Sequence, residues 1–169
     1  MNVLLIITVL MSSLWPMDVP PEQGDPYIIV NKASNEVGWI NDGNVQDVFP
    51  AATGRTKDLT PEGEFTLIVK AKDPYYRKLD IEGGSKDNPL GSRWLGFDAK
   101  GTDGRMYGIH GTNEPEKISE YVSNGCIRLR NDDVIRLFDQ APVGTRVWVG
   151  AEQHKSIATI AGELNLLYE

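Results

Sequence analysis

Short runs of β-branched and aromatic residues, each bounded by turn residues, occupy most of this chain from Tyr27 onward. The run Tyr27–Val30 is one of them, and Asp42-Gly43 separates two others as a hairpin turn would. Residues of these types are enriched in strands. The predicted strands are 27–30, 36–41, 45–49, 64–71, 94–98, 105–109, 126–129 and 145–149. The fold is therefore expected to be mainly β.

Helical patterns are few. Residues 115–122 are predicted to form a short helix, with Pro115 in its first turn and Gly125 just beyond its end. Asn131 is the expected N-cap of a second helix, because two aspartates follow it and favour the helix dipole. The apolar stripe of that helix is Val134, Leu137 and Phe138.

The two ends of the chain differ from its middle. Residues 3–14 are largely apolar, and a helix of that length would reach about 18 Å, short of the roughly 30 Å hydrocarbon core of a bilayer. The length fits the apolar part of an export signal, although no Lys or Arg precedes it and no Ala-X-Ala site follows; a membrane anchor or a buried segment are the alternatives. We expect a signal-like segment and proline-rich linker at 1–26, one domain at 27–150, and a helical tail at 151–169. An extracytoplasmic location follows from this interpretation.

Composition argues against several functions. The net charge is −7 at pH 7 and the sequence pI is about 4.9, whereas a nucleic-acid-binding protein requires a basic face. The single cysteine rules out an internal disulfide and a cysteine-rich metal site, and His154 lies far off in the tail. We expect no metal and no cofactor.

The single cysteine, Cys126, follows Gly125, and His110 lies 16 residues upstream. A lone cysteine is more often a small buried hydrophobe than a nucleophile, and a lone histidine is usually structural. Here Gly125 permits a close backbone approach of the kind that an oxyanion pocket needs, and His110 is a base for a thiol whose free pKa is about 8.5. Arg128 would share a strand face with Cys126, where it could favour a thiolate or bind a substrate carboxylate. An ion pair with one of the many local acids, such as Asp132 or Asp133, is the structural alternative.

His110, its spacer and Ser123-Asn124-Gly125-Cys126-Ile127-Arg128 resemble the signature of the L,D-transpeptidase catalytic domain family (YkuD-type). Ala52-Thr53-Gly54 with Thr60–Phe65, and Asn88–Gly91 with Arg93–Gly96, are similar to further segments of that family. The resemblance runs from about 27 to 149 and implies a β-sandwich or barrel-like catalytic domain with two or three short helices. Many members carry a second histidine where this chain has Asn124, so we assign the base to His110.

The resemblance implies a peptidoglycan L,D-transpeptidase that acts on stem peptides. Cys126 would attack the bond between the third residue of a stem tetrapeptide and its terminal D-alanine, and an amine would resolve the thioester to form a crosslink. His110 would take the thiol proton or hold a thiolate as an ion pair, oriented by the carbonyl of Gly111. Backbone N–H groups of Gly125 and Cys126 would hold the oxyanion. The expected substrate contacts are Arg128, Asn124, Ser123 and, with core packing as its alternative, Tyr107.

Three functions remain open at this point. With water as the acceptor, the same site would be an L,D-carboxypeptidase; with an inert thiol, the chain would be a wall-binding domain. A carbapenem is expected to form a stable thioester with Cys126 if the thiol is reactive. Residues 73–85 are expected to form either a surface loop or a lid over the site, and Trp39 and Trp94 are expected in the core.

Overall fold

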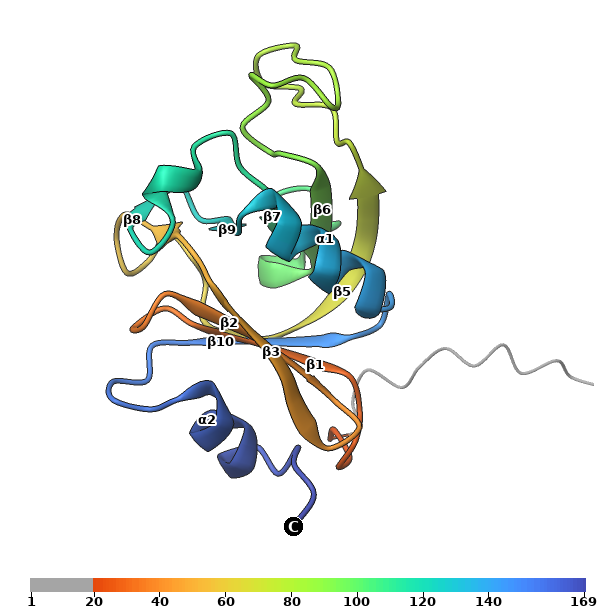
Figure 1. Cartoon of the computed structure of the whole chain (residues 1–169), viewed down its shortest axis with the longest axis vertical. Helices are drawn as coiled ribbons and strands as arrows, with labels where there is room; N and C mark the ends of the chain where they lie inside the picture. The colour runs from red at the N-terminus through yellow and green to blue at the C-terminus, as the bar shows by residue number, and fades with distance from the viewer. Residues whose placement is uncertain (1–19) are drawn as a thin grey trace, which may run out of the picture.

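Eight strands form one curled sheet with a helix on either side of it (Figure 1). The computed structural model describes residues 20–169, so the apolar segment 3–14 lies outside the described part of the chain. Across the sheet the order is β3 (Asn44–Pro50), β2 (Glu36–Asn41), β1 (Tyr27–Asn31), β10 (Arg146–Gly150), β5 (Gly63–Lys72), β6 (Arg93–Phe97), β7 (Tyr107–His110) and β9 (Ile127–Arg128). β1 with β10 and β7 with β9 are parallel pairs, and the other neighbours are antiparallel. The prediction of a mainly β fold is confirmed.

Strand β1 lies in the middle of one half of the sheet and is buried on both faces. Ile28 and Val30 point into the main core, whereas Tyr27 and Ile29 point into a second cluster on the opposite face. A strand that is covered on both sides needs apolar residues at every position, because successive side chains alternate between the faces. This explains the uninterrupted apolar run at the start of the domain.

The long strand β5 joins the two halves of the sheet. Its first residues pair with β10 and its last residues pair with β6, and the register shifts between Leu67 and Val69. An irregularity of this kind strengthens the local twist of a strand. The sheet curls at this point and carries β6, β7 and β9 over the main core (Figure 1).

Helix α1 (Asn131–Gln140) packs on β6 and β7, and its predicted stripe of Val134, Leu137 and Phe138 is buried in the main core. The predicted N-cap at Asn131 is wrong, because Arg130 occupies the cap position. The Asn131 side chain instead accepts a hydrogen bond from the Ser92 N–H at 3.1 Å and donates one to the Thr112 carbonyl at 3.0 Å. It therefore joins the start of the helix to the segment that follows His110.

The predicted helix at 115–122 is also wrong. Only a 3-10 turn, η2 (Pro115–Lys117), forms, and the chain then enters β8 (Tyr121–Ser123), which pairs in parallel with β4 (Thr53–Gly54). Ser119 has a φ of +75°, which no residue inside a helix adopts, and its N–H donates to the Ala51 carbonyl at 2.9 Å. Tertiary hydrogen bonding thus replaces the helix. The other 3-10 turn, η1 (Ala99–Gly101), follows β6.

The tail packs against the sheet through α2 (Ile157–Glu163), which covers β1, β2 and β3 (Figure 1). Ile157, Ile160 and Ala161 are buried there against Tyr27, Ile29 and Ile40. The hairpin predicted at Asp42-Gly43 is present, and both residues have positive φ values of 49° and 66°, as a two-residue hairpin turn favours. No helix among residues 20–169 is long and apolar enough to cross a membrane.

Loss of the α2 contact should destabilise the whole domain. Ile160→Ala is expected to lower the free energy of unfolding by about 2–4 kcal/mol, since Ile160 is 2% exposed and its truncation leaves a cavity. Gly162→Ala in the same helix is the matched control: a Cβ there meets no neighbour, so this change should leave stability unchanged or raise it by up to about 1 kcal/mol. Urea unfolding measures both. Equal midpoints for Ile160→Ala and the wild type would contradict the packing of the tail on the sheet.

Candidate active site

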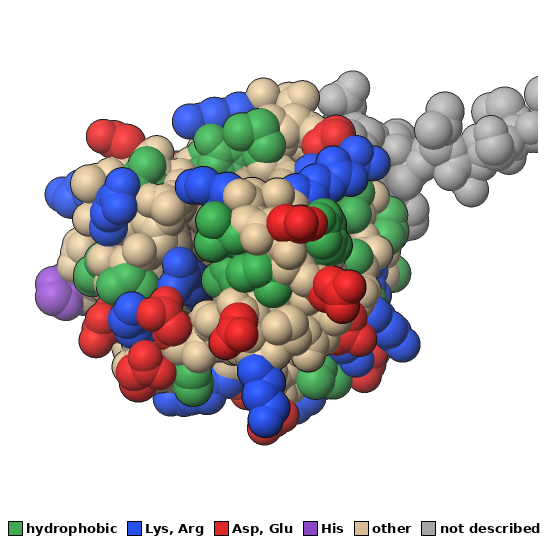
Figure 2. Space-filling model, turned by 90° about the horizontal axis from the view of Figure 1, so that it is seen from above, with side chains coloured by type: hydrophobic (Ala, Val, Ile, Leu, Met, Phe, Trp, Pro, Cys, Tyr) green, Lys and Arg blue, Asp and Glu red, His purple; other side chains and the backbone are tan. Residues whose placement is uncertain are grey.

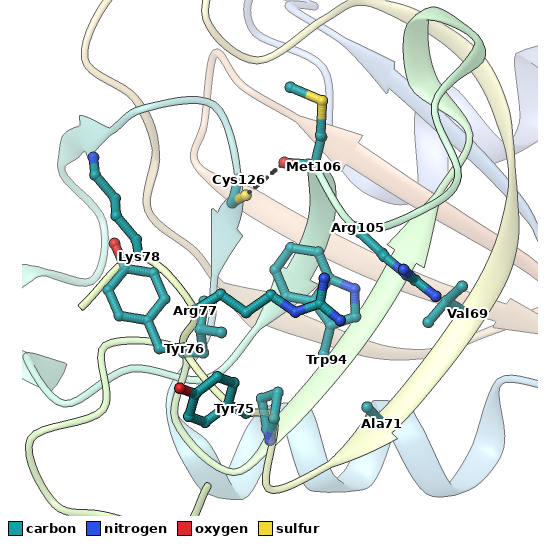
Figure 3. A pocket seen from close by; sticks show the side chains of 12 residues that line it. Val69, Ala71, Tyr75, Tyr76, Arg77, Lys78, Trp94, Arg105, Met106 and Cys126 are labelled. Carbon is teal, nitrogen blue, oxygen red and sulfur yellow. Dashed lines mark hydrogen bonds between the residues drawn. The ribbon is translucent and has the colours of Figure 1, made fainter. Parts of the chain in front are cut away.

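A cavity of about 510 Å³ opens beside Cys126 at the end of the molecule that carries the long connection between β5 and β6. Figure 2 looks onto this end and shows hydrophobic side chains in the middle of the face, with Lys and Arg side chains beside them. Cys126, Trp94 and Met106 lie on one side of the cavity, and Tyr75 and Tyr76 come from the connection (Figure 3). The single thiol is therefore placed at the wall of a ligand-sized space.

The loop before Cys126 is held by its own hydrogen bonds. Ser123 Oγ donates to the Cys126 carbonyl at 2.6 Å and accepts from the Gly125 N–H at 3.1 Å. Gly125 has a φ of +132°, and a Cβ there would lie 2.5 Å from the Leu59 carbonyl oxygen. Only glycine fits this combination of dihedral angle and backbone approach.

The segment that contacts Gly125 is braced by a buried lysine. Lys32 is 6% exposed, and its Nζ donates to the carbonyls of Lys57 and Thr60 at 2.8 and 2.9 Å. Its charge is paired with Glu62, 2.8 Å away. These bonds fix the segment 57–60, and with it the Leu59 carbonyl, against the loop that bears Cys126.

His110 is the last residue of β7 and is 4% exposed. Its Nδ1 lies 2.6 Å from the Gly111 carbonyl oxygen, the contact that the family resemblance implied. Burial lowers the pKa of His110 to about 4, so the ring is neutral at neutral pH. A carbonyl oxygen only accepts hydrogen bonds, so Nδ1 carries the proton and the lone pair of the neutral ring is on Nε2. This is the tautomer that a general base at Nε2 requires.

Trp94, which was expected in the core, has a second role. It is buried, but its indole lines the cavity and stacks on the His110 ring, with 5.5 Å between the ring centroids and 18° between the planes. The paired glycines Gly96 and Gly108 leave room for the indole, because a Cβ on either would clash with it. The indole Nε1 donates to the Gly104 carbonyl at 2.8 Å. Gly96 and Gly108 lie on neighbouring predicted strands, but their pairing depends on the strand register, which only the structure supplies.

Burial favours the protonated form of the Cys126 thiol. Burial raises its pKa to about 11, although a hydrogen bond with the Gly108 backbone and the charge of Arg128 both act to lower it. The Sγ–H donates to the Met106 carbonyl at 3.4 Å (Figure 3). Taken with the low pKa of His110, this describes a neutral thiol and a neutral imidazole. Of the two expected states, the pre-formed thiolate–imidazolium ion pair is the one that the electrostatics disfavour.

Arg128 lies opposite His110 in the parallel pairing of β7 and β9. Its Nη1 is 3.2 Å from Glu114, so Arg128 forms an ion pair with a local acid, as the structural alternative expected, although the acid is neither Asp132 nor Asp133. Glu114 also pairs with Lys117, and these two cations hold its pKa below the usual value, Lys117 contributing most. The backbone of Arg128 exchanges two hydrogen bonds of 2.9 Å with Ala52. Arg128 is thus held on both its side chain and its backbone.

The other expected substrate contacts differ in exposure. Ser123 is buried and its hydroxyl is used within the loop, whereas Asn124 is exposed. Tyr107 is partly buried against the main core, and its ring lies beside the Gly125 backbone. The Gly125 N–H already donates a hydrogen bond to the Ser123 hydroxyl. Of the two expected oxyanion donors, the Cys126 N–H is therefore the better candidate. The substrate roles of these residues stay predictions.

Among residues 20–169, no three His, Cys, Asp or Glu side chains are grouped closely enough to hold a metal ion. The chemistry available to the described site is that of a thiol, an imidazole, a guanidinium and backbone N–H groups. Together these are the groups of a cysteine nucleophile with a histidine base.

Trp94 should control the protonation of His110 by excluding water from it. Trp94→Leu is expected to raise the pKa of His110 from about 4 toward 6.5, whereas Trp94→Phe, which keeps an aromatic ring over the imidazole, should change it much less. The unfolded chain takes up a proton below about 6.5 that the folded chain excludes, so acidification from pH 6.5 to 4 should destabilise the wild type, and Trp94→Leu should flatten this dependence. Imidazole NMR titration and urea unfolding at several pH values measure both effects. An unchanged His110 pKa in folded Trp94→Leu would contradict the assignment.

Comparisons with known proteins agree with the site. A model of the YkuD family, the L,D-transpeptidase catalytic domain, matches residues 25–149. YqjB of Bacillus subtilis, named as an L,D-transpeptidase, is 58% identical over 93% of this chain and 89% of its own length. YkuD of the same organism, also named as an L,D-transpeptidase, is 36% identical over 78% of this chain and 73% of its own length.

Solved structures give the same fold at low sequence identity. An L,D-transpeptidase from Mycobacterium smegmatis aligns with a TM-score of 0.59 at 22% identity, over 76% of this chain and 59% of that one. An L,D-transpeptidase from Enterococcus faecium aligns with a TM-score of 0.61 at 21% identity, over 76% of this chain and 50% of that one. The present chain thus spans only part of the length of these solved chains. The family match and the relatives together show that the chain belongs to the L,D-transpeptidase catalytic domain family.

Proposed function

We propose that this chain is a cysteine acyltransferase that forms peptidoglycan crosslinks through a thioester. The observations that carry the proposal are a cavity-lining thiol directly before β9 and, at the end of the neighbouring strand β7, a buried neutral imidazole whose Nδ1 is fixed on the Gly111 carbonyl. The family supports an enzyme that acts on peptidoglycan peptides. The proposed substrate is a stem tetrapeptide with an L-centre at its third residue and a terminal D-alanine.

In the first half-reaction, Cys126 Sγ attacks the carbonyl carbon of the third residue. The thiol proton moves to Nε2 of His110 as the S–C bond forms, since neither group is charged beforehand. The negative charge that develops on the carbonyl oxygen is held by backbone N–H groups near Cys126. The C–N bond then breaks, and His110 returns the proton to the amine of the departing D-alanine.

In the second half-reaction, an amine of another stem attacks the thioester carbonyl. His110 accepts a proton from that amine and returns it to the sulfur as the S–C bond breaks, so that the thiol is regenerated. Arg128 is proposed to orient a carboxylate of the substrate, because a guanidinium binds a carboxylate in a bidentate manner. Its position beside His110 in the β7–β9 pairing, and its influence on the pKa of Cys126, support this role.

The proposed place of action is outside the cytoplasm. Peptidoglycan stems are crosslinked there, and residues 3–14 have the length of the apolar part of an export signal. A fusion of residues 1–26 to a reporter enzyme that is active only after export would test this. No export of the fusion would contradict the proposal that this segment directs the chain across a membrane.

The function is tested by product analysis with a stem tetrapeptide. Wild type should release D-alanine and, with an acceptor amine present, form the crosslinked dimer. Cys126→Ser is expected to keep the fold and lose turnover by at least about 10³-fold, because a hydroxyl activated by this base is a far weaker nucleophile. Release of D-alanine and free tripeptide, with no dimer at any acceptor concentration, would identify an L,D-carboxypeptidase.

A folded wild type that turns over no peptide would contradict an enzymatic role. Binding of stem peptide by that inactive protein, with no acyl adduct on Cys126, would identify a wall-binding domain. A carbapenem supplies an independent probe, since a reactive Cys126 should form a stable adduct that intact-mass spectrometry detects.

A further inference from the structure

The cavity beside Cys126 is lined by three cations and, among the described residues, by no acid. Arg77, Lys78 and Arg105 are the cations, and apolar side chains make up most of the remaining lining. The chain as a whole has 24 acidic and 17 basic residues, so its composition does not account for a positively charged cavity. Figure 3 shows Arg77 reaching in front of Trp94 from one wall and Arg105 lying at the opposite wall.

Arg77 and Lys78, the two cations of the β5–β6 connection, lie in a hairpin that is held by hydrogen bonds. Tyr76 and Ile81 exchange two backbone hydrogen bonds, of 2.9 and 3.2 Å, on either side of Arg77 and Lys78. Asn88 is 1% exposed, and its side-chain Nδ2 donates to the carbonyls of Pro74 and Glu82 at 2.8 and 3.1 Å. The buried amide thus closes the base of the hairpin and fixes where its cations lie.

These cations are available to a ligand. Neither Arg77 nor Lys78 forms an ion pair with another residue in the range 20–169, although acids are present in the same connection. One of those acids, Asp80, accepts a hydrogen bond from the Tyr75 hydroxyl instead. Arg105 lies 3.7 Å from Asp103, but both side chains are about two-thirds exposed, and pairs of this kind contribute little.

We propose that Arg77 and Lys78 select an acyl donor that carries free carboxylates in addition to that of its terminal D-alanine. This selectivity rests on the proposed function. It specifies whether the carboxylates of the stem peptide in the cavity are free or amidated. Guanidinium and ammonium groups bind carboxylates through charge-assisted hydrogen bonds, which amidation of the carboxylates removes with little change of shape. The apolar lining accommodates the remainder of the peptide, and Arg105 adds to the positive potential at the opposite wall.

The test compares two stem tetrapeptides with a diamino diacid at the third residue. One has free carboxylates at its second and third residues, the other has both amidated, and both keep the terminal D-alanine carboxylate. Wild type should prefer the free form by about tenfold in kcat/KM for D-alanine release, the factor expected for one charge-assisted hydrogen bond. The double variant Arg77→Gln/Lys78→Gln should reduce this preference to below about threefold.

Lys86→Gln is the matched control, because Lys86 lies in the same connection, is exposed and does not line the cavity. It should keep the tenfold preference of the wild type. Equal kcat/KM of the wild type for the two peptides, or a preference that survives the double substitution, would overturn the selection by charge while leaving the proposed function intact. Failure of the wild type to release D-alanine from either peptide would overturn the proposed function, and this inference with it.

Discussion

The parallel pairing of β7 with β9 places Ile109 opposite Ile127 and His110 opposite Arg128. Parallel neighbours need a crossover connection, and here the connection contains η2, β8 and the loop that ends at Cys126. Ile109 and Ile127 are fully buried in the main core, so hydrophobic packing fixes the register. A slip of one residue would turn Ile127 outward and move Cys126 away from the cavity. The core thereby determines the geometry of the site.

Several interactions remote from the thiol also help to fix the geometry of the site. Lys32 fixes the segment whose carbonyl lies against Gly125, and Asn131 ties the start of α1 to Thr112, just beyond His110. Trp94 stacks on the His110 imidazole, and Gly96 and Gly108 leave room for its indole ring. Burial favours a neutral base and a protonated thiol, and in the mechanism that we propose the proton transfer is accordingly coupled to attack on the substrate.

The periodicity and turn chemistry of the sequence were sufficient for most of the fold. The strand at 27–30, the hairpin at Asp42-Gly43 and the apolar stripe of α1 all depend on local patterns, and all are present. The helix predicted at 115–122 failed because its backbone bonds to Ala51 and β4, segments that are distant in the sequence. Asn131 failed as an N-cap for the same reason, since its side chain has tertiary partners.

The predictable part of the candidate site consists of the single cysteine and one of the two histidines, each of which is next to a glycine. Cys126, His110 and the carbonyl of Gly111 could be named from the motif, and the structure adds the tautomer and the charge state. The ion pair of Arg128 with Glu114 and the stacking of Trp94 on His110 could not be predicted from the motif. Both contacts depend on how β6, β7 and β9 align. The cationic lining of the cavity likewise requires the position of the β5–β6 connection.

The central claim is that Cys126 carries the acyl group between the two half-reactions. Rapid-quench intact-mass spectrometry of the protein during turnover of a stem tetrapeptide tests it most directly. We predict a transient mass increase equal to the tripeptide acyl group, mapped by proteolysis to Cys126, removed by hydroxylamine and absent from Cys126→Ala. Turnover without any adduct on Cys126, or an adduct at another residue, would contradict it.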